Sequence, residues 1–301
     1  MSELRIVAPT RDRVGESPVW DGAAQALYWV DIEGRQIRRW DRQRDETRSW
    51  DLPERVGCIA LAGEGRLIAA MESGIFAVTL GAPPQAELAL LAGIDHPAPG
   101  MRFNDGRCDA RGRLWVGTMV MDMSLAAPVG GLYCLDERGL AGPHVEGLVT
   151  PNGLGFSPDG RTLYLSDSHP TVQKIWAFDF DAETGSLSRR RLFVDMAPLP
   201  GRPDGAAVDA QGHYWICAND AGLVHRFAPD GRLLASLALP VSKPAMCAFG
   251  GPDLATLFVT SIQPADPAPQ EQGLSGALFA LPTSVRGRAE PQFSGLWPVF
   301  S

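Results

Sequence analysis

The 301-residue sequence lacks any run of about 18 apolar residues, the length that a membrane-spanning helix requires. Its first residues, MSELRIVAPTRDRVGE, contain no apolar core of the kind found in a secretory signal peptide. A basic surplus is also absent, because 27 Lys and Arg are opposed by 35 Asp and Glu, which gives a net charge of −8. We therefore expect a cytoplasmic protein whose partners include neither nucleic acid nor membranes.

Paired cysteine motifs are missing as well. The five cysteines form no CxxC pair and are odd in number, which favours buried free thiols in a reducing compartment. Sustained apolar periodicity of 3.6 residues is absent, so we expect few helices. Glycine (33) and proline (25) are instead numerous and spread along the chain, which favours many tight turns.

One phrase, a turn followed by an apolar-aromatic strand that tends to end on Asp or Ser, recurs along the chain. Its copies are AAQALYWVD, GEGRLIAAM, DARGRLWVGT, SPDGRTLYLSD, DAQGHYWICAND and GPDLATLFVTS. The first apolar residues of these strands are Leu27, Leu67, Leu114, Leu163, Tyr214 and Leu257. Six tandem units of short antiparallel strands predict an all-β fold, a six-bladed β-propeller that occupies residues 1–301 as a single domain.

Four oxygen-bearing side chains precede these strands by 10 or 11 residues, namely Glu16, Asn104, Asn152 and Asp204. The innermost strand of each blade lines the central channel of a propeller, so residues at one phase of the repeat meet around one axis. We expect the four side chains to gather at one mouth of that channel. In the other two copies the same phase falls on Val56-Gly57 and Met246.

Glu16 and Asp204 would place two negative charges in a partly dry site, which requires a cation or a shared proton. Carboxylate and amide oxygens suit hard ions such as Ca²⁺, Mg²⁺ or Mn²⁺, whereas Zn²⁺ and Fe²⁺ usually prefer some nitrogen or sulfur. None of the five histidines falls at this phase. We predict one divalent ion at the centre of the propeller, with Ca²⁺ the best match and Zn²⁺, Mn²⁺, Mg²⁺ and Fe²⁺ as alternatives.

A turn is the alternative explanation for an Asp-Gly pair. Pro158-Asp159-Gly160 is such a turn, directly before its strand, whereas the same tripeptide around Asp204 lies about ten residues before the next one. This difference in phase separates a ligand from a turn residue. Arg102, two residues before Asn104, is either an ordinary surface cation or a group that binds a polar ligand beside the site.

Several longer strings carry a family resemblance: VGESPVWD, LYWVDIEGRQI, RFNDGRCDARGRLWVGTM, TPNGLGFSPDGRTLYLSDS and RPDGAAVDAQGHYW. Through them the chain resembles the SMP-30/gluconolactonase/LRE family, which includes regucalcin, over essentially its whole length. The resemblance implies a six-bladed propeller with one divalent metal in its central cavity and, in many members, hydrolysis of aldonolactones.

The resemblance also implies roles for individual residues. Glu16, Asn152 and Asp204 would bind the metal, Asp204 would be the catalytic base, and Arg102 and Asn104 would bind the substrate. Where several family members carry an acidic residue that touches the sugar, this chain reads MVMDMSLAAPVGG. Asp122 would then substitute as a substrate-binding residue, or the methionine-rich loop would make the pocket more apolar.

The predicted function is a metal-dependent hydrolase that opens sugar lactones such as gluconolactone. An aryl-ester or organophosphate hydrolase built on the same metal is one alternative, and a non-enzymatic metal-binding propeller is another. The oligomeric state stays open.

Overall fold

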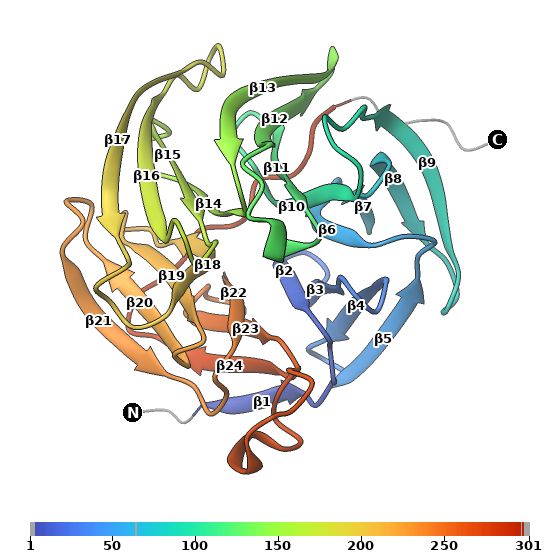
Figure 1. Ribbon diagram of the computed structural model, residues 1–301. Helices are drawn as coiled ribbons and strands as arrows, with labels where there is room; N and C mark the ends of the chain where they lie inside the picture. Colours follow the sequence, from blue (N-terminus) through green and yellow to red (C-terminus); the bar gives the residue numbers. More distant parts are fainter. Residues whose placement is uncertain (1–3, 64, 296, 298–301) are drawn as a thin grey trace.

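A computed structural model describes residues 4–63, 65–295 and 297, and in them 24 strands form six four-stranded sheets around a central axis (Figure 1). Each sheet is antiparallel, and the first strand of each contacts the first strands of its neighbours. This arrangement confirms the all-β, six-bladed propeller. The expected single domain of 1–301 extends over residues 1–3, 64, 296 and 298–301, which lie outside the described residues.

The six sheets, called blades here, follow the sequence in order. Blade 1 contains β2 (Gly15–Asp21), β3 (Ala26–Asp31), β4 (Gln36–Asp41) and β5 (Glu46–Asp51). Blade 2 contains β6 (Val56–Leu61), β7 (Arg66–Met71), β8 (Gly74–Leu80) and β9 (Ala86–Gly93). Blade 3 contains β10 (Met101–Cys108), β11 (Leu114–Val120), β12 (Gly130–Asp136) and β13 (Gly139–Leu148).

The second half of the ring repeats the pattern. Blade 4 contains β14 (Pro151–Phe156), β15 (Thr162–Asp167), β16 (Lys174–Phe180) and β17 (Leu187–Asp195). Blade 5 contains β18 (Arg202–Val208), β19 (Tyr214–Asn219), β20 (Leu223–Phe227) and β21 (Leu233–Ala238). Blade 6 contains β22 (Pro244–Gly250), β23 (Thr256–Ser261), β24 (Leu278–Pro282) and β1 (Arg5–Ala8).

Helices are few, as the missing 3.6-residue periodicity predicted. The described residues contain only two short 3₁₀ helices, η1 (Met123–Leu125) and η2 (Pro269–Glu271). Within those residues, none of the helices combines the length and the apolar character needed to cross a membrane. All five cysteines are buried free thiols, in agreement with the expectation from their spacing.

The ring is closed by the N-terminal strand. β1 pairs antiparallel with β24, so the outermost strand of the last blade comes from the start of the chain. An unpaired edge of β24 would expose backbone N–H and C=O groups. The closure therefore joins the two ends of the propeller through backbone hydrogen bonds.

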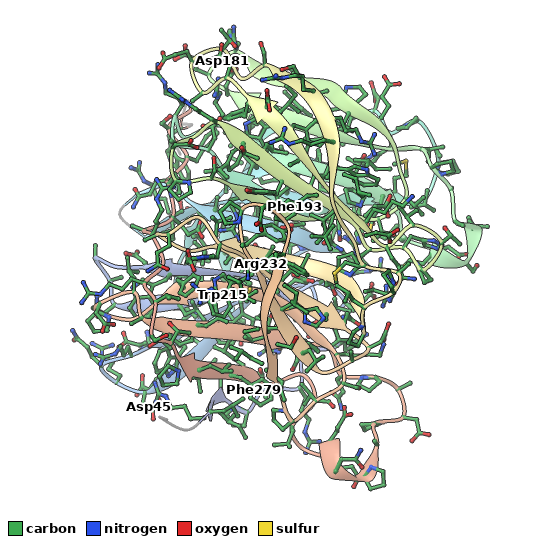
Figure 2. All side chains as sticks on the ribbon, turned by 90° about the vertical axis from the view of Figure 1, so that its left-hand side faces the viewer. Asp45, Asp181, Phe193, Trp215, Arg232 and Phe279 are labelled. Carbon is green, nitrogen blue, oxygen red and sulfur yellow. The ribbon has the colours of Figure 1, made fainter. Side chains whose placement is uncertain are left out.

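Two copies of the repeat share one stabilising device. Trp115 Nε1 donates to Asp109 Oδ2 at 2.9 Å in blade 3, and Trp215 Nε1 donates to Asp209 Oδ2 at 3.0 Å in blade 5. Each Asp also accepts backbone N–H groups from the turn between the first two strands. The repeated Asp and Trp thus join a turn to a strand; Figure 2 shows Trp215 among the packed strands of the wall.

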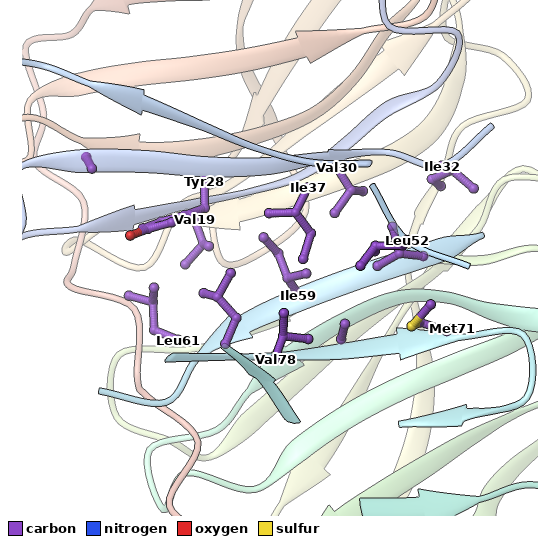
Figure 3. Close-up of a cluster of buried hydrophobic side chains, with 14 residues drawn as sticks. Val19, Tyr28, Val30, Ile32, Ile37, Leu52, Ile59, Leu61, Met71 and Val78 are labelled. Carbon is purple, nitrogen blue, oxygen red and sulfur yellow. The ribbon is translucent and has the colours of Figure 1, made fainter. Parts of the chain in front are cut away.

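Apolar side chains between neighbouring blades make the wall rigid. Figure 3 shows the cluster between blades 1 and 2, where Ile37 and Val30 face Ile59 and Val78. Each fully buried aliphatic side chain of this kind contributes roughly 1.5–3 kcal/mol. The packed wall holds the first strands of the blades in fixed positions around the axis.

Candidate active site

The predicted site residues lie where the first strands are irregular. A β-bulge follows Glu16 in β2 and Asn152 in β14, and bulges in β10 and β18 include Asn104 and Asp204. A bulge leaves an extra residue unpaired and re-aims the side chains beside it. Gly153 supplies the required backbone conformation in β14, with φ +60°. This is why an Asn-Gly pair stands inside a buried strand.

Three of the four predicted side chains form one hydrogen-bonded chain. Asn104 Nδ2 donates to Asn152 Oδ1 at 2.9 Å, and Asn152 Nδ2 donates to Asp204 Oδ1, also at 2.9 Å. Arg102 Nη1 donates to Asn104 Oδ1 at 2.6 Å. The structure therefore brings Arg102, Asn104, Asn152 and Asp204 together from three blades.

The direction of this chain follows from its two ends. The guanidinium of Arg102 can only donate, and the ionised carboxylate of Asp204 can only accept. Each amide between them must then present its oxygen toward Arg102 and its nitrogen toward Asp204. The chain thereby fixes the orientations of both asparagines, including the amide oxygen of Asn152.

Glu16 enters from blade 1 and is buried. Its Oε2 accepts the backbone N–H of Ser17 at 3.2 Å, and Ser17 has φ +50°. Ser17 Oγ in turn accepts the N–H of Ile59 at 2.9 Å, which ties this bulge to blade 2. The backbone beside Glu16 is therefore fastened to β6 of blade 2.

Three buried carboxyl groups, Glu16, Asp105 and Asp204, lie near one another, and burial makes their ionised forms unfavourable. Burial raises the pKa of Asp204 to about 7 and that of Asp105 to about 6. The pKa of Glu16 lies well above its ordinary value because of burial, followed by repulsion from Asp204 and Asp105. The fold thus assembles more negative charge than it neutralises.

The neighbouring cations are already engaged. Arg102 is buried, which lowers its pKa to about 10, and its Nη1 also donates to the carbonyl of Phe103 at 2.8 Å. Arg202 pairs with Asp220 at 2.6 Å. An additional cation would relieve the repulsion between Glu16 and Asp204.

The donor set fits a hard divalent ion. Across the described residues no three His, Cys, Asp or Glu side chains gather as a metal site, so the third ligand would be the amide oxygen of Asn152. Two carboxylates and an amide are all-oxygen donors, which suits Ca²⁺, Mg²⁺ or Mn²⁺. Asp105 Oδ1 is a further buried oxygen, and no described residue forms a hydrogen bond with it.

Asp122 lies apart from this chain. It is exposed and caps η1, where its Oδ1 accepts from Ser124 N at 3.0 Å and from Ser124 Oγ at 2.6 Å. The loop 121–129 that carries it follows β11, whose end pairs with the start of β10, and the green coil of η1 lies near the middle of the ring in Figure 1. A contact between Asp122 and substrate stays a prediction.

The segment after β15 connects this loop to the site. Ser168 Oγ accepts from Asn152 Nδ2 at 2.8 Å, and the ring Nε2 of the next residue, His169, lies 3.0 Å from the carbonyl of Met123 in η1. The loop 121–129 is thus held by a neighbour of the candidate metal ligands. Sequence reasoning did not assign Ser168 or His169 to the site.

Asn219 was also missed. It ends β19, and its Nδ2 donates to Asp204 Oδ2 at 2.7 Å. Its place at a strand end was a signal in the sequence, since β19 ends on Asn219 where β3 and β15 end on Asp31 and Asp167.

Comparison with known proteins identifies the family of the chain. The SMP-30/gluconolactonase/LRE-like region matches residues 14–263. The chain belongs to this family. The family assignment rests on five-sixths of the chain and agrees with the resemblance seen in its motifs.

Individual members of the SMP-30/gluconolactonase/LRE-like family resemble the chain over nearly its full length. The 6-deoxy-6-sulfogluconolactonase of Pseudomonas putida is 37% identical and aligns with 97% of this chain and 99% of its own. A pentonolactonase of Haloferax volcanii is 33% identical, with 96% and 97% covered. The crystal structure of the calcium-binding protein regucalcin from Agrobacterium tumefaciens superposes with a TM-score of 0.89 at 28% identity and covers 97% of each chain.

Proposed function

We propose that the protein is a lactonase that opens sugar lactones such as gluconolactone with the help of one divalent ion. The observation that carries the proposal is the hydrogen-bonded chain that ends on Asp204 beside a second buried carboxylate, Glu16. Relatives named as lactonases support the reaction class.

Glu16, Asn152 and Asp204 would hold the ion. When bound, a divalent cation polarises a carbonyl group and offsets the negative charge that develops on its oxygen. We favour Ca²⁺ because the donors are all oxygen and because a structural relative is described as a calcium-binding protein. Mn²⁺, Mg²⁺, Zn²⁺ and Fe²⁺ are the alternatives to be compared.

Asp204 acts as the general base in this proposal. Its carboxylate accepts a proton from the water that attacks the lactone carbonyl carbon. The proton then passes to the ring oxygen as the bond between that oxygen and the carbonyl carbon breaks, which regenerates the carboxylate and releases the hydroxy acid. The amide of Asn152 keeps the Asp204 carboxylate in place through its 2.9 Å hydrogen bond.

Arg102 and Asn104 bind and orient the hydroxyl groups of the sugar. Both side chains are buried beside Asn152 and Asp204. The guanidinium of Arg102 can only donate hydrogen bonds, and a sugar hydroxyl can accept one from it. Orientation of the substrate near the base contributes to the rate without new bonds to the reacting atoms.

One observation favours a second candidate, an aryl-ester or organophosphate hydrolase. Leu125 and Val129 in the loop 121–129 are exposed, although apolar side chains gain from being covered. An aromatic leaving group would cover them. Asp122, in the same loop, would instead bind a sugar hydroxyl if the lactone is the substrate.

The test compares wild type with Asp204→Asn on γ- and δ-aldonolactones and aryl esters, after reloading with Ca²⁺, Mn²⁺, Mg²⁺ or Zn²⁺. Loss of the base should lower kcat by about 10²–10⁴-fold. Asp159→Asn is the matched control, because Asp159 stands in the same Pro-Asp-Gly tripeptide but in an exposed turn.

A rate for Asp204→Asn close to wild type, after subtraction of spontaneous ring opening, would show that Asp204 is not the base. Faster turnover of aryl esters than of every lactone would favour the second candidate. Binding of a cation without hydrolysis of either class would favour a non-enzymatic metal-binding propeller.

A further inference from the structure

The end of β19 makes contacts that differ from those of the equivalent strand ends. In blade 1, Asp31 at the end of β3 accepts the backbone N–H of Val14 at 3.1 Å. In blade 4, Asp167 at the end of β15 accepts the N–H groups of Val149 and Thr150 at 2.8 and 3.0 Å. Both acids thus fasten the segment that leads into the first strand of their own blade.

Blade 5 places an amide at this edge of the sheet instead. Asn219 is fully buried, and its Nδ2 donates to Asp204 Oδ2 at 2.7 Å and to the carbonyl of Pro244 at 3.2 Å. Its contact is therefore with a functional side chain and with blade 6. A carboxylate here would be a second acceptor facing Asp204, so the position requires a donor.

The orientation of Asn219 is determined from both sides. Arg202 Nη2 donates to Asn219 Oδ1 at 3.3 Å, and a guanidinium has no acceptor. The amide nitrogen must then face Asp204 and Pro244. Arg202 is held in turn by Asp220 at 2.6 Å and by the carbonyl of Ser168 at 3.1 Å.

Both oxygens of Asp204 consequently receive an amide N–H. Asn152 of blade 4 donates to Oδ1, and Asn219 of blade 5, the blade that also contains Asp204, donates to Oδ2. Two donors at different oxygens define the plane of the carboxylate, whereas one donor leaves it free to rotate. Gly205, the next residue, lies against Met246, so the backbone beside Asp204 is also closely packed.

We propose that Asn219 is a positioning residue that sets the plane of the Asp204 carboxylate, with Arg202 fixing the Asn219 amide. Its consequence for cation binding and hydrolysis rests on the function proposed above. Loss of a hydrogen-bond partner behind a metal ligand typically lowers metal affinity or activity by about 10–100-fold. Removal of Asn219 should therefore weaken cation binding without removing any ligand.

The experiment uses two substitutions and a control. Asn219→Leu keeps the branched shape of the side chain but removes the donor, and Asn219→Ser keeps a shorter donor. Ser166→Ala is the control, because Ser166 is buried and donates to the carbonyl of Pro203, directly before Asp204, at 3.2 Å. It removes a nearby hydrogen bond that does not reach the carboxylate.

Three measurements are made on each full-length variant: a crystal structure without metal, calorimetric titration with Mn²⁺ alone, and lactone kinetics at saturating Mn²⁺. For Asn219→Leu we expect a rotated Asp204 carboxylate, an Mn²⁺ affinity about 10–100-fold weaker, and a lower kcat with KM within threefold of wild type. Asn219→Ser should recover part of the affinity. Ser166→Ala should lower thermal stability and leave the Mn²⁺ affinity within threefold.

An unrotated Asp204 in Asn219→Leu, with an unchanged Mn²⁺ affinity, would overturn the proposal. If Asn219→Leu does not fold, Asn219→Ser is the deciding variant. A wild-type affinity for Mn²⁺, together with an unrotated Asp204 carboxylate, would then overturn the proposal. If wild type binds no Mn²⁺ and opens no lactone, the proposed function fails. The crystal structures then still decide the role of Asn219, since a rotated carboxylate supports positioning and an unrotated one refutes it.

Discussion

Substitution of Glu290 by Gln tests how the C-terminal segment stabilises the propeller. This segment follows blade 6 and crosses the face opposite the candidate site. Ala210 N donates to Arg286 O at 2.9 Å, Phe293 N donates to Leu61 O at 2.7 Å, and Ser294 N donates to Gly112 O at 3.0 Å, which joins the segment to blades 5, 2 and 3. Figure 1 shows it in red, running behind the blades.

Glu290 lies in the middle of this segment and forms an ion pair with Arg107 of β10. The two side chains are only 16% and 10% exposed, and Arg107 Nη2 also donates to Ala206 O at 2.7 Å. Removal of one partner from a fully buried pair costs about 3–5 kcal/mol, whereas exposed pairs contribute about 0.2–1 kcal/mol. For this largely covered pair we expect Glu290→Gln to lower the free energy of unfolding by about 2 kcal/mol.

The expected change in Tm follows from the size of the chain. An unfolding entropy of about 2.1 cal/mol/K per residue gives a decrease of about 3 °C for 2 kcal/mol. Differential scanning calorimetry measures it. The control is Glu183→Gln, because Glu183 pairs with Arg111 at the surface, where the side chains are 76% and 52% exposed, and should change Tm by less than about 1 °C. Equal decreases for the two variants would refute the reasoning from burial.

Two further predictions concern the backbone of the site and the pH dependence of stability. Gly153→Ala should lower the unfolding free energy, measured in urea, by about 2–3 kcal/mol, because φ is +60° and an added Cβ would collide with Tyr214 and Ser166. Gly160→Ala is the control and should lower it by about 1 kcal/mol, because φ is also positive but the added Cβ would only touch Ala182 at 3.6 Å. Similar losses for the two variants would argue against the collision. Burial raises the pKa of Asp12 to about 6 in the folded protein. The protonated side chain therefore contributes fully to stability below the pKa that Asp12 has in the unfolded chain, and this contribution is lost as the pH rises through 6. The unfolding free energy of Asp12→Asn relative to wild type should therefore increase from pH 4 to pH 7, and a decrease would contradict the sign.

The sequence alone determined the all-β architecture, the number of blades and the candidate residues at one phase of the repeat. Leu163 and Tyr214 could be recognised as strand starts because turn residues and apolar alternation are local properties of the chain. The same spacing predicted that Asn152 and Asp204 would meet, since a repeated unit places equivalent residues at equivalent heights around an axis. Their hydrogen bond confirms the proximity, and their roles in metal binding and catalysis stay predictions.

Only the tertiary structure decided which groups complete the site and the ring. The pairing of β1 with β24, the crossing of Glu290 to Arg107 and the hydrogen bond from Asn219 to Asp204 join segments that no local pattern relates. Such contacts depend on the direction of a side chain after the sheets have packed, because the repeat specifies the position of a backbone segment but not the partner that its polar atoms will find.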